Sequence, residues 1–224
     1  MIPYKDDNPT STFPFVTIGI IALNIFIFLF EVASQSGMKD VTYAYGAIPH
    51  YILTFEKNQP IHPALTIFSS MFMHGGFFHL GGNMLYLWIF GNNIEDRLGH
   101  IRFIFFYIFC GIVSAYAYAV TNSHSLIPMI GASGAVSGIL GAYLLLFPRT
   151  HVHTLVFLGF FITTVRIPAL IVIGFWAILQ FVNGLLSTGL NEGGGVAWFA
   201  HIGGFLIGLL TIKLWLPKRT KYWL

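Results

Sequence analysis

The chain has 224 residues, of which 56% are hydrophobic and only 8% are charged. A soluble domain carries about 25% charged residues, so this chain has too few charges to cover its surface in water. Most of it must be surrounded by lipid. The formal net charge of +3 does not indicate a nucleic-acid partner, because the Lys and Arg residues are scattered over short loops. The one cysteine, Cys110, lies in an apolar run, which excludes a disulfide framework and predicts inert packing.

Six apolar runs are long enough to be considered as membrane spans, since a spanning helix needs about 20 mostly apolar residues. They are Phe15 to Phe30, Phe72 to Phe90, Ile101 to Val120, Gly131 to Phe147, Ile167 to Leu186 and Val196 to Leu216. The sequence therefore predicts an all-α polytopic membrane protein, a six-transmembrane-helix bundle that forms one membrane domain over residues 1–224. A polar tail (1–12), which does not resemble a signal peptide, and a basic tail (217–224) flank it.

The segments between these runs differ in character. Residues 32–69 are too polar to span a membrane yet rich in Tyr and Phe, which favours an interfacial loop with short helices. Residues 91–97 are expected to form a tight charged turn. Residues 150–166 are apolar but interrupted by His151, His153 and Arg166, so they are expected to lie along the surface or to dip into the membrane and return. Residues 187–195 form a glycine-rich link.

The distribution of basic residues predicts the orientation of the spans. Six spans place both termini on one side, together with nine of the eleven basic residues: Lys5, Arg97, Arg102, Arg149, Arg166, Lys213, Lys218, Arg219 and Lys221. Only Lys39 and Lys57 fall on the other side. Because basic residues concentrate in cytoplasmic loops, we expect both termini to be cytoplasmic. The starts of the fourth and sixth spans then face the outer side.

Small residues recur at four-residue spacing in the fourth and sixth spans. They are Gly134 and Gly138 in the fourth and Ala200, Gly204 and Gly208 in the sixth. Such faces allow two membrane helices to approach closely. Packing them together would bring Ser133 within reach of His201.

Taken singly, Ser133 is expected to be a helix cap or packing residue, and His201 a buried histidine bonded to a backbone carbonyl. Together they form a nucleophile and a base, since a serine hydroxyl is a weak nucleophile until a neighbouring imidazole takes its proton. All eight acidic residues lie in loops, tails or span ends. We therefore expect a Ser–His dyad without a buried acid, its imidazole held by packing.

The second span supplies further polar groups at the same depth. His79 and Asn83 lie one helical turn apart, and their N–H groups could stabilise the oxyanion that forms when a hydroxyl attacks an amide carbonyl. Backbone N–H groups at Ser133 could add to them. His74 lies five residues before His79, so it does not share its helical face. For His74 an interhelical hydrogen bond is the favoured interpretation.

Four motifs in this order resemble the rhomboid family of intramembrane serine proteases. They are His74-x4-His79-x3-Asn83, the run from Gly91 to Gly99, Gly131-Ala132-Ser133-Gly134, and Ala200-His201-x-Gly203-Gly204. The resemblance covers nearly the whole chain in the six-helix bacterial form. It implies a location in the bacterial inner membrane.

The resemblance also implies roles for individual residues: Ser133 as nucleophile, His201 as general base, and His79, Asn83 and the Ser133 backbone as oxyanion stabilisers. It implies substrates that are single-span membrane proteins cut near the outer surface after a small residue. No cofactor or metal is expected. Residues 167–186 would form a gate and residues 187–198 a cap.

The chain departs from the family pattern at two places. Ser137 occupies a position where many relatives carry an aromatic residue that supports the histidine ring, so another aromatic residue is expected to support His201. The first loop has no Trp or Arg between Ala33 and Ser70, so a different anchor is needed there. Gly193, Gly194 and Gly195 could be the hinge of a lid or only a flexible connection.

Three other functions are considered. A catalytically inactive relative would bind membrane helices without cutting them. A haem or metal protein would use His74, His79 and His201, but no histidines repeat with ligand spacing on one helix. A transporter is disfavoured because no inverted repeat and no intramembrane charges are evident. The sequence does not indicate an oligomeric state.

Overall fold

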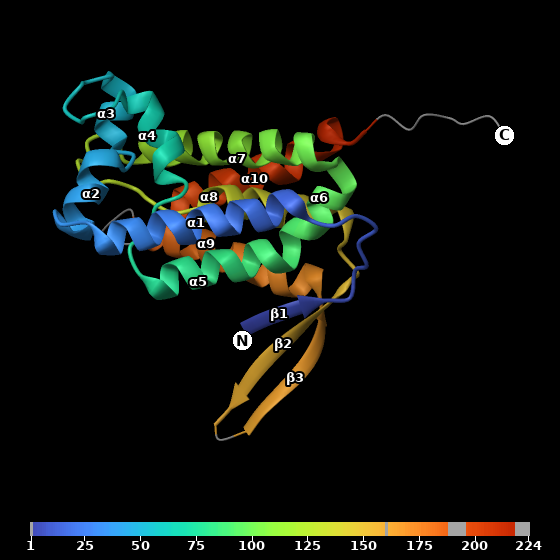
Figure 1. Cartoon of the computed structure of the whole chain (residues 1–224). Coiled ribbons are helices and arrows are strands. Elements are labelled where there is room, and N and C mark those ends of the chain that lie inside the picture. The colour runs from blue at the N-terminus through green and yellow to red at the C-terminus, as the bar shows by residue number, and fades with distance from the viewer. Residues whose placement is uncertain (1, 160, 188–195, 218–224) are drawn as a thin grey trace.

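The computed structural model describes residues 2–159, 161–187 and 196–217. Within them, four helices are long and apolar enough to cross a membrane: α1 (Phe15–Ala33), α7 (His100–Thr121), α9 (Ala169–Ser187) and α10 (Trp198–Trp215). They correspond to four of the predicted spans. The shorter apolar helix α8 (Ser133–Leu146) corresponds to a fifth, and it runs through the middle of the bundle (Figure 1). The chain is thus a mostly helical, multi-pass membrane protein.

The remaining predicted span is a composite helix. It begins as α5 (Phe77–Tyr86), passes through the π-helical turn η1 (Leu87–Gly91) and continues as α6 (Asn92–Leu98). The prediction of a tight turn over residues 91–97 is therefore wrong. The charged residues there are helical, and the chain turns at Gly99, whose φ of +77° suits glycine.

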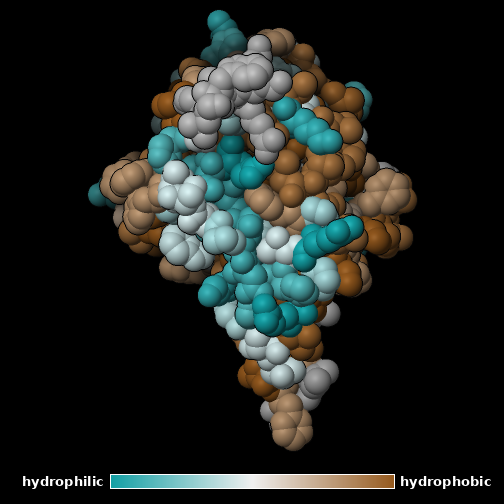
Figure 2. Space-filling model, turned by 90° about the vertical axis from the view of Figure 1, so that its right-hand side faces the viewer, coloured by the Kyte–Doolittle hydropathy of each residue, from teal (hydrophilic) through white to brown (hydrophobic). Residues whose placement is uncertain are grey.

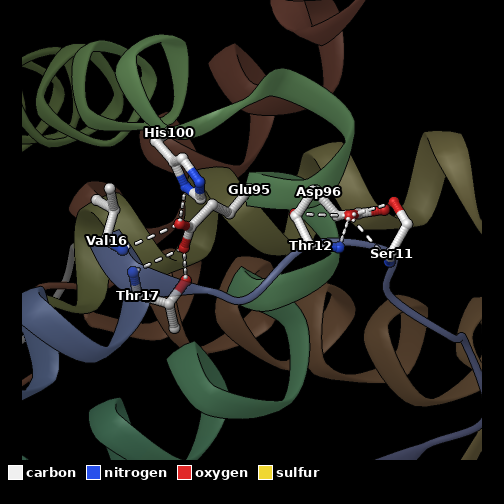
Figure 3. Close-up of polar contacts among 7 residues, drawn as sticks. All are labelled: Ser11, Thr12, Val16, Thr17, Glu95, Asp96 and His100. Atoms are coloured by element: carbon white, nitrogen blue, oxygen red, sulfur yellow. Dashed lines mark hydrogen bonds and ion pairs between the residues drawn. The ribbon is translucent and has the colours of Figure 1, made fainter.

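The charged end of α6 binds the beginning of α1 (Figure 3). Glu95 is fully buried and accepts hydrogen bonds from the backbone N–H groups of Val16 (2.9 Å) and Thr17 (2.7 Å), from the Thr17 hydroxyl (2.7 Å) and from His100 (2.6 Å). The first N–H groups of a helix have no intrahelical acceptor, and α1 has no capping side chain of its own. Glu95 supplies that cap from another helix.

Residues 32–69 contain the short helices α2 (Gly37–Tyr45) and α3 (Pro49–Thr54) and most of α4 (Pro63–Ser70). This confirms the prediction of short helices in the first loop. Ala47 and Met129 exchange two backbone hydrogen bonds (3.1 and 2.8 Å), and the Gln59 amide donates to the carbonyls of Tyr43 and Gly46 at 2.9 Å each. These contacts anchor the loop, which has no Trp or Arg between Ala33 and Ser70.

A three-stranded antiparallel sheet corrects the all-α prediction. Its strands are β1 (Ile2–Asp6), β2 (His151–Leu158) and β3 (Phe161–Pro168), in the order β1-β2-β3. Residues 150–166, expected to lie along the surface or to dip into the membrane, instead form most of a β-hairpin. Their β-branched and aromatic content favours strands, and Gly159 at the hairpin end has a φ of +63°. The N-terminal residues, expected to be a tail, supply the third strand.

Helix α8 packs closely between α10 and α7. A Cβ atom added at Gly208 would lie 2.0 Å from the Gly138 carbonyl oxygen, and one added at Gly204 would lie 2.1 Å from that of Gly134. A Cβ atom added at Gly138 would lie 2.5 Å from the side chain of Cys110 on α7, a fully buried thiol, and 3.2 Å from the Gly204 carbonyl oxygen on α10. The predicted pairing of small-residue faces is confirmed.

The surface of the molecule divides into polar and apolar zones. Figure 2 views the end of the bundle at which α6 lies, with hydrophilic residues over its centre and hydrophobic residues on its flanks. Along the helices, large apolar side chains such as Phe26 (69%), Leu210 (73%) and Leu214 (84%) are exposed. Apolar flanks of this extent match a molecule whose sides contact lipid.

Candidate active site

The structure brings Ser133 and His201 into direct contact. Ser133 is the first residue of α8, and His201 is the fourth residue of α10. The close glycine packing of these helices leaves Ser133 Oγ 2.8 Å from His201 Nε2. This distance allows a proton to pass from the hydroxyl to the imidazole.

The second nitrogen of His201 meets a residue that sequence reasoning missed. Gln180, on α9, places its Oε1 2.8 Å from His201 Nδ1, and its own Nε2 donates to the Trp176 carbonyl at 3.2 Å. The expectation that packing alone holds the imidazole is therefore incomplete. The signal was present in the sequence, because an amide in an apolar span is a functional suspect, although Asn183 in the same span gives the same signal.

Aromatic rings also flank His201, as expected from the serine at position 137. The ring centroids of Trp176 and Trp198 lie 6.1 and 6.2 Å from that of His201. Ser137 itself donates its hydroxyl hydrogen to the Ser133 carbonyl at 2.6 Å. It is thus bonded to its own helix and does not support the imidazole.

A cavity of about 910 Å³ opens over the two residues. Its lining includes Ser133 and His201 together with His79 and Asn83 from α5. Most of the rest of its wall is apolar or aromatic. A cavity of this size with a few convergent polar groups is typical of a ligand site, and it is large enough for a short peptide segment.

His79 presents an N–H group to this cavity. The backbone N–H of Gly75 donates to His79 Nδ1 at 3.3 Å, so the neutral ring carries its hydrogen on Nε2. That atom lies beside Gly131, where an added Cβ would be 2.7 Å from His79 Nε2 and 3.6 Å from Ser133 Oγ. With a φ of +124°, position 131 accepts only glycine without strain.

Asn83 offers a second donor. Its side chain is only 8% exposed, and among the described residues its Nδ2 has no hydrogen-bond partner. Buried amide groups are usually satisfied, so this one is available to a group that enters the cavity. The backbone N–H groups at the start of α8 lie before the helix's first i→i−4 bonds and add further donors.

The Rhomboid domain family model matches residues 62–218, more than half of the chain and every residue of the cavity described above. The chain belongs to the rhomboid family. It is 32% identical over 151 residues to the mitochondrial Rhomboid protein 1 of Saccharomyces cerevisiae, covering 65% of this chain and 40% of that protein. It is 28% identical over 220 residues to Rhomboid protease GluP of Bacillus subtilis, covering 98% and 38%. This rhomboid thus spans about two fifths of the length of these relatives.

His74 lies outside the helix that carries His79 and Asn83. It precedes α5 and is fully buried, with its ring centroid 5.0 Å from that of His79. Neither ring nitrogen has a hydrogen-bond partner among the described residues, so the interhelical bond predicted for this ring is absent there. Instead the backbone N–H of His74 donates to the buried Glu31 carboxylate at 3.1 Å.

Some predicted features of this rhomboid lie outside the described residues. They are most of the proposed cap, including Gly193, Gly194 and Gly195, and nearly all of the basic tail. Within residues 2–159, 161–187 and 196–217, no three His, Cys, Asp or Glu side chains are grouped in a way that could hold a metal ion.

Proposed function

We propose that this rhomboid is an intramembrane serine endopeptidase that uses Ser133 as nucleophile and His201 as general base. The single observation that carries the proposal is the 2.8 Å contact between Ser133 Oγ and His201 Nε2, two residues that line the cavity. Family membership supports the same chemistry.

The reaction begins when His201 Nε2 takes the hydroxyl proton as Ser133 Oγ attacks the carbonyl carbon of the scissile bond. The tetrahedral intermediate carries a negative oxygen. His79 Nε2–H, Asn83 Nδ2–H and the N–H groups at the start of α8 stabilise that oxygen, and they are fixed before the charge develops.

The intermediate collapses when protonated His201 gives its proton to the leaving amine, which frees the C-terminal product. The N-terminal part remains as an ester on Ser133. A water molecule, activated by the same imidazole, attacks this ester and restores the enzyme. The cavity must therefore admit water, and it is partly open to the surface.

The substrates are single-span membrane proteins, cut near the outer surface after a small residue. A helical substrate must unwind locally before its carbonyl is accessible, because helical carbonyls are hydrogen-bonded. The enzyme crosses the membrane six times, counting α8 and the composite helix α5–η1–α6, with both termini in the cytoplasm. Its active site faces the outer side.

The test is cleavage of a single-span model substrate in proteoliposomes by the unaltered protein, Ser133→Ala and His201→Ala. We expect cleavage only by the unaltered protein, with both variants folded and still binding the substrate. Cleavage by either variant would refute the assigned roles. Binding without cleavage by all three proteins would instead favour the inactive, helix-binding relative.

A further inference from the structure

We propose that Gln180 is a positioning residue that fixes the tautomer of His201, so that the general base is complete only while α9 is packed against α10. This inference rests on the proposed function, in which His201 Nε2 must accept a proton from Ser133. It adds a third member to the pair, and that member is a neutral amide on a different helix.

The orientation of the Gln180 amide follows from its partners. The Trp176 carbonyl, 3.2 Å from one end of the amide, can only accept a hydrogen bond, so the NH₂ group must lie at that end. The opposite orientation would place two oxygens against each other. Oε1 therefore faces His201 Nδ1 at 2.8 Å, and it can only accept.

The orientation of the amide determines the state of the imidazole. A neutral imidazole has one N–H group and one lone pair. With Oε1 facing Nδ1, the hydrogen resides on Nδ1 and the lone pair on Nε2. That lone pair faces Ser133 Oγ at 2.8 Å. In the other tautomer, Nε2 would carry a hydrogen and could not take the serine proton.

The burial of Gln180 strengthens the preference of His201 for the Nδ1–H tautomer. Gln180 is only 7% exposed, so water competes weakly for either end of its amide. A carboxylate at this position would be costly to bury inside a membrane protein, whereas an amide orients the ring without a charge. Among the described residues, both hydrogen-bond partners of the His201 ring, Gln180 and Ser133, are neutral.

The contact also links the base to the position of a peripheral helix. Gln180 and Trp176 both belong to α9, whose other side exposes Phe175 and Ile178 at 58% and 62%. The Gln180–Trp176 bond lies within α9, while the Gln180–His201 bond crosses to α10. Moving α9 away would remove both the acceptor and the Trp176 ring from His201, and the base would lose its fixed tautomer.

The test compares the unaltered protein with Gln180→Leu, which keeps the size but removes the acceptor, and with Gln180→Glu. In Gln180→Glu, the protonated carboxyl group can donate to the Trp176 carbonyl and accept from His201, so this variant should preserve the tautomer. Asn183→Leu, three residues along α9, is the matched control for loss of an amide. Histidine ¹⁵N NMR, with the His201 signals identified by their absence in His201→Ala, reports the tautomer independently of cleavage.

We expect a single Nδ1–H tautomer of neutral His201 in the unaltered protein and in Gln180→Glu, and a mixture in Gln180→Leu. For Gln180→Leu, kcat should fall roughly tenfold with KM little changed, the scale of one lost hydrogen bond. Gln180→Glu and Asn183→Leu should retain kcat within a few-fold.

An Nε2–H tautomer in the unaltered protein would overturn the proposal even if Gln180→Leu fails to fold. Unchanged tautomer and kcat in a folded Gln180→Leu would do the same. Because the NMR result needs no turnover, it stands apart from the cleavage test of Ser133 and His201, and failure of one proposal can be distinguished from failure of the other.

Discussion

Two histidines near the candidate nucleophile carry their ring hydrogen on different nitrogens. His201 turns the lone pair of Nε2 toward Ser133, because its Nδ1 faces the Gln180 oxygen. His79 turns an N–H toward the same cavity, because its Nδ1 accepts the Gly75 N–H. Histidine thus serves as a proton acceptor at position 201 and as a hydrogen-bond donor at position 79. In each case the partner of Nδ1 determines whether Nε2 carries a hydrogen.

The free donor of Asn83 gives a prediction at the residue scale. Asn83→Ala should lower kcat by about 10²- to 10³-fold, the usual effect of removing one oxyanion donor, while KM changes little. Steady-state kinetics on a model substrate would measure both constants. Asn183→Ala, which removes an amide that does not line the cavity, serves as the control. A fall confined to KM would show that Asn83 binds substrate and does not stabilise the transition state.

At the scale of elements, the contact between α8 and α10 depends on glycines that tolerate no side chain. Gly208→Ala would place a methyl group 2.0 Å from the Gly138 carbonyl, so the helices must separate. Gly174→Ala on α9 makes the same chemical change where nothing lies within 4 Å. We expect Gly208→Ala to lower both the free energy of unfolding and activity. Gly174→Ala should be neutral or stabilising by up to about 1 kcal/mol.

Unfolding of both variants in mixed micelles, followed by circular dichroism, would provide this comparison. Equal stabilities for Gly208→Ala and Gly174→Ala would contradict the close packing. Retained activity in Gly208→Ala would show that the Ser133–His201 contact does not depend on the close packing of α8 against α10.

The cap that Glu95 provides for α1 gives a second prediction at this scale (Figure 3). Glu95→Ala would leave the buried N–H of Thr17 and the partly buried N–H of Val16 without acceptors. It should lower the free energy of unfolding by about 1–3 kcal/mol or more. Asp96 also binds the chain before α1, through Ser11 and Thr12, but these contacts are exposed. Asp96→Ala should therefore lower the free energy of unfolding by less than Glu95→Ala does. A larger loss for Asp96→Ala in the same unfolding assay would overturn this order.

A pH-sensitive contact joins the end of β1 to strands β2 and β3. Arg166 and His153 bind the Asp7 carboxylate and hold its pKa at about 2, below its ordinary value of 3.8. A group with a lowered pKa stabilises the fold above its unfolded pKa and loses that contribution as pH falls through its folded pKa. The contribution of Asp7 should thus be complete above about pH 4 and lost toward about pH 2.

Thermal unfolding of the unaltered protein and of Asp7→Asn across this range would test the attachment. The unaltered protein should have the higher midpoint at neutral pH, and the two midpoints should converge as the pH approaches about 2. A difference that does not change with pH would show that the Asp7 charge is not responsible.

At the scale of the whole molecule, the start of α1 and the end of α10 lie at one end of the bundle, and the starts of α8 and α10 lie at the other (Figure 1). With the proposed orientation, a cysteine replacing Thr10 should react with an impermeant maleimide only from the cytoplasmic side. One replacing His124 should react only from the outer side. The buried Cys110 should remain unlabelled. Labelling of both introduced cysteines from one side would contradict the proposed topology.

The sequence predicted the features that depend on local pattern. Apolar length indicated the long helices, and glycines four residues apart indicated the packing that joins Ser133 to His201. Other features depend on partners distant in the chain. β1 pairs with a strand about 150 residues away, and an apolar run such as 150–166 does not by itself distinguish a hairpin from a membrane segment.

Two further differences have the same origin. The acids of α6 suggested a turn because their partners, the N–H groups and hydroxyls before and within α1, are absent from the local sequence. Gln180 is one of two amides in the otherwise apolar α9, and the sequence alone does not distinguish it from Asn183. Its role emerges only when α9 and α10 are seen together.

The most direct test of the central claim is covalent labelling with a fluorophosphonate serine probe, followed by mass spectrometry of the adduct. An activated hydroxyl reacts with such a probe, whereas an ordinary serine does not. We predict one adduct on Ser133 in the unaltered protein, and none in Ser133→Ala or His201→Ala. An adduct at another residue, or undiminished labelling of folded His201→Ala, would contradict the claim that these two side chains share a proton.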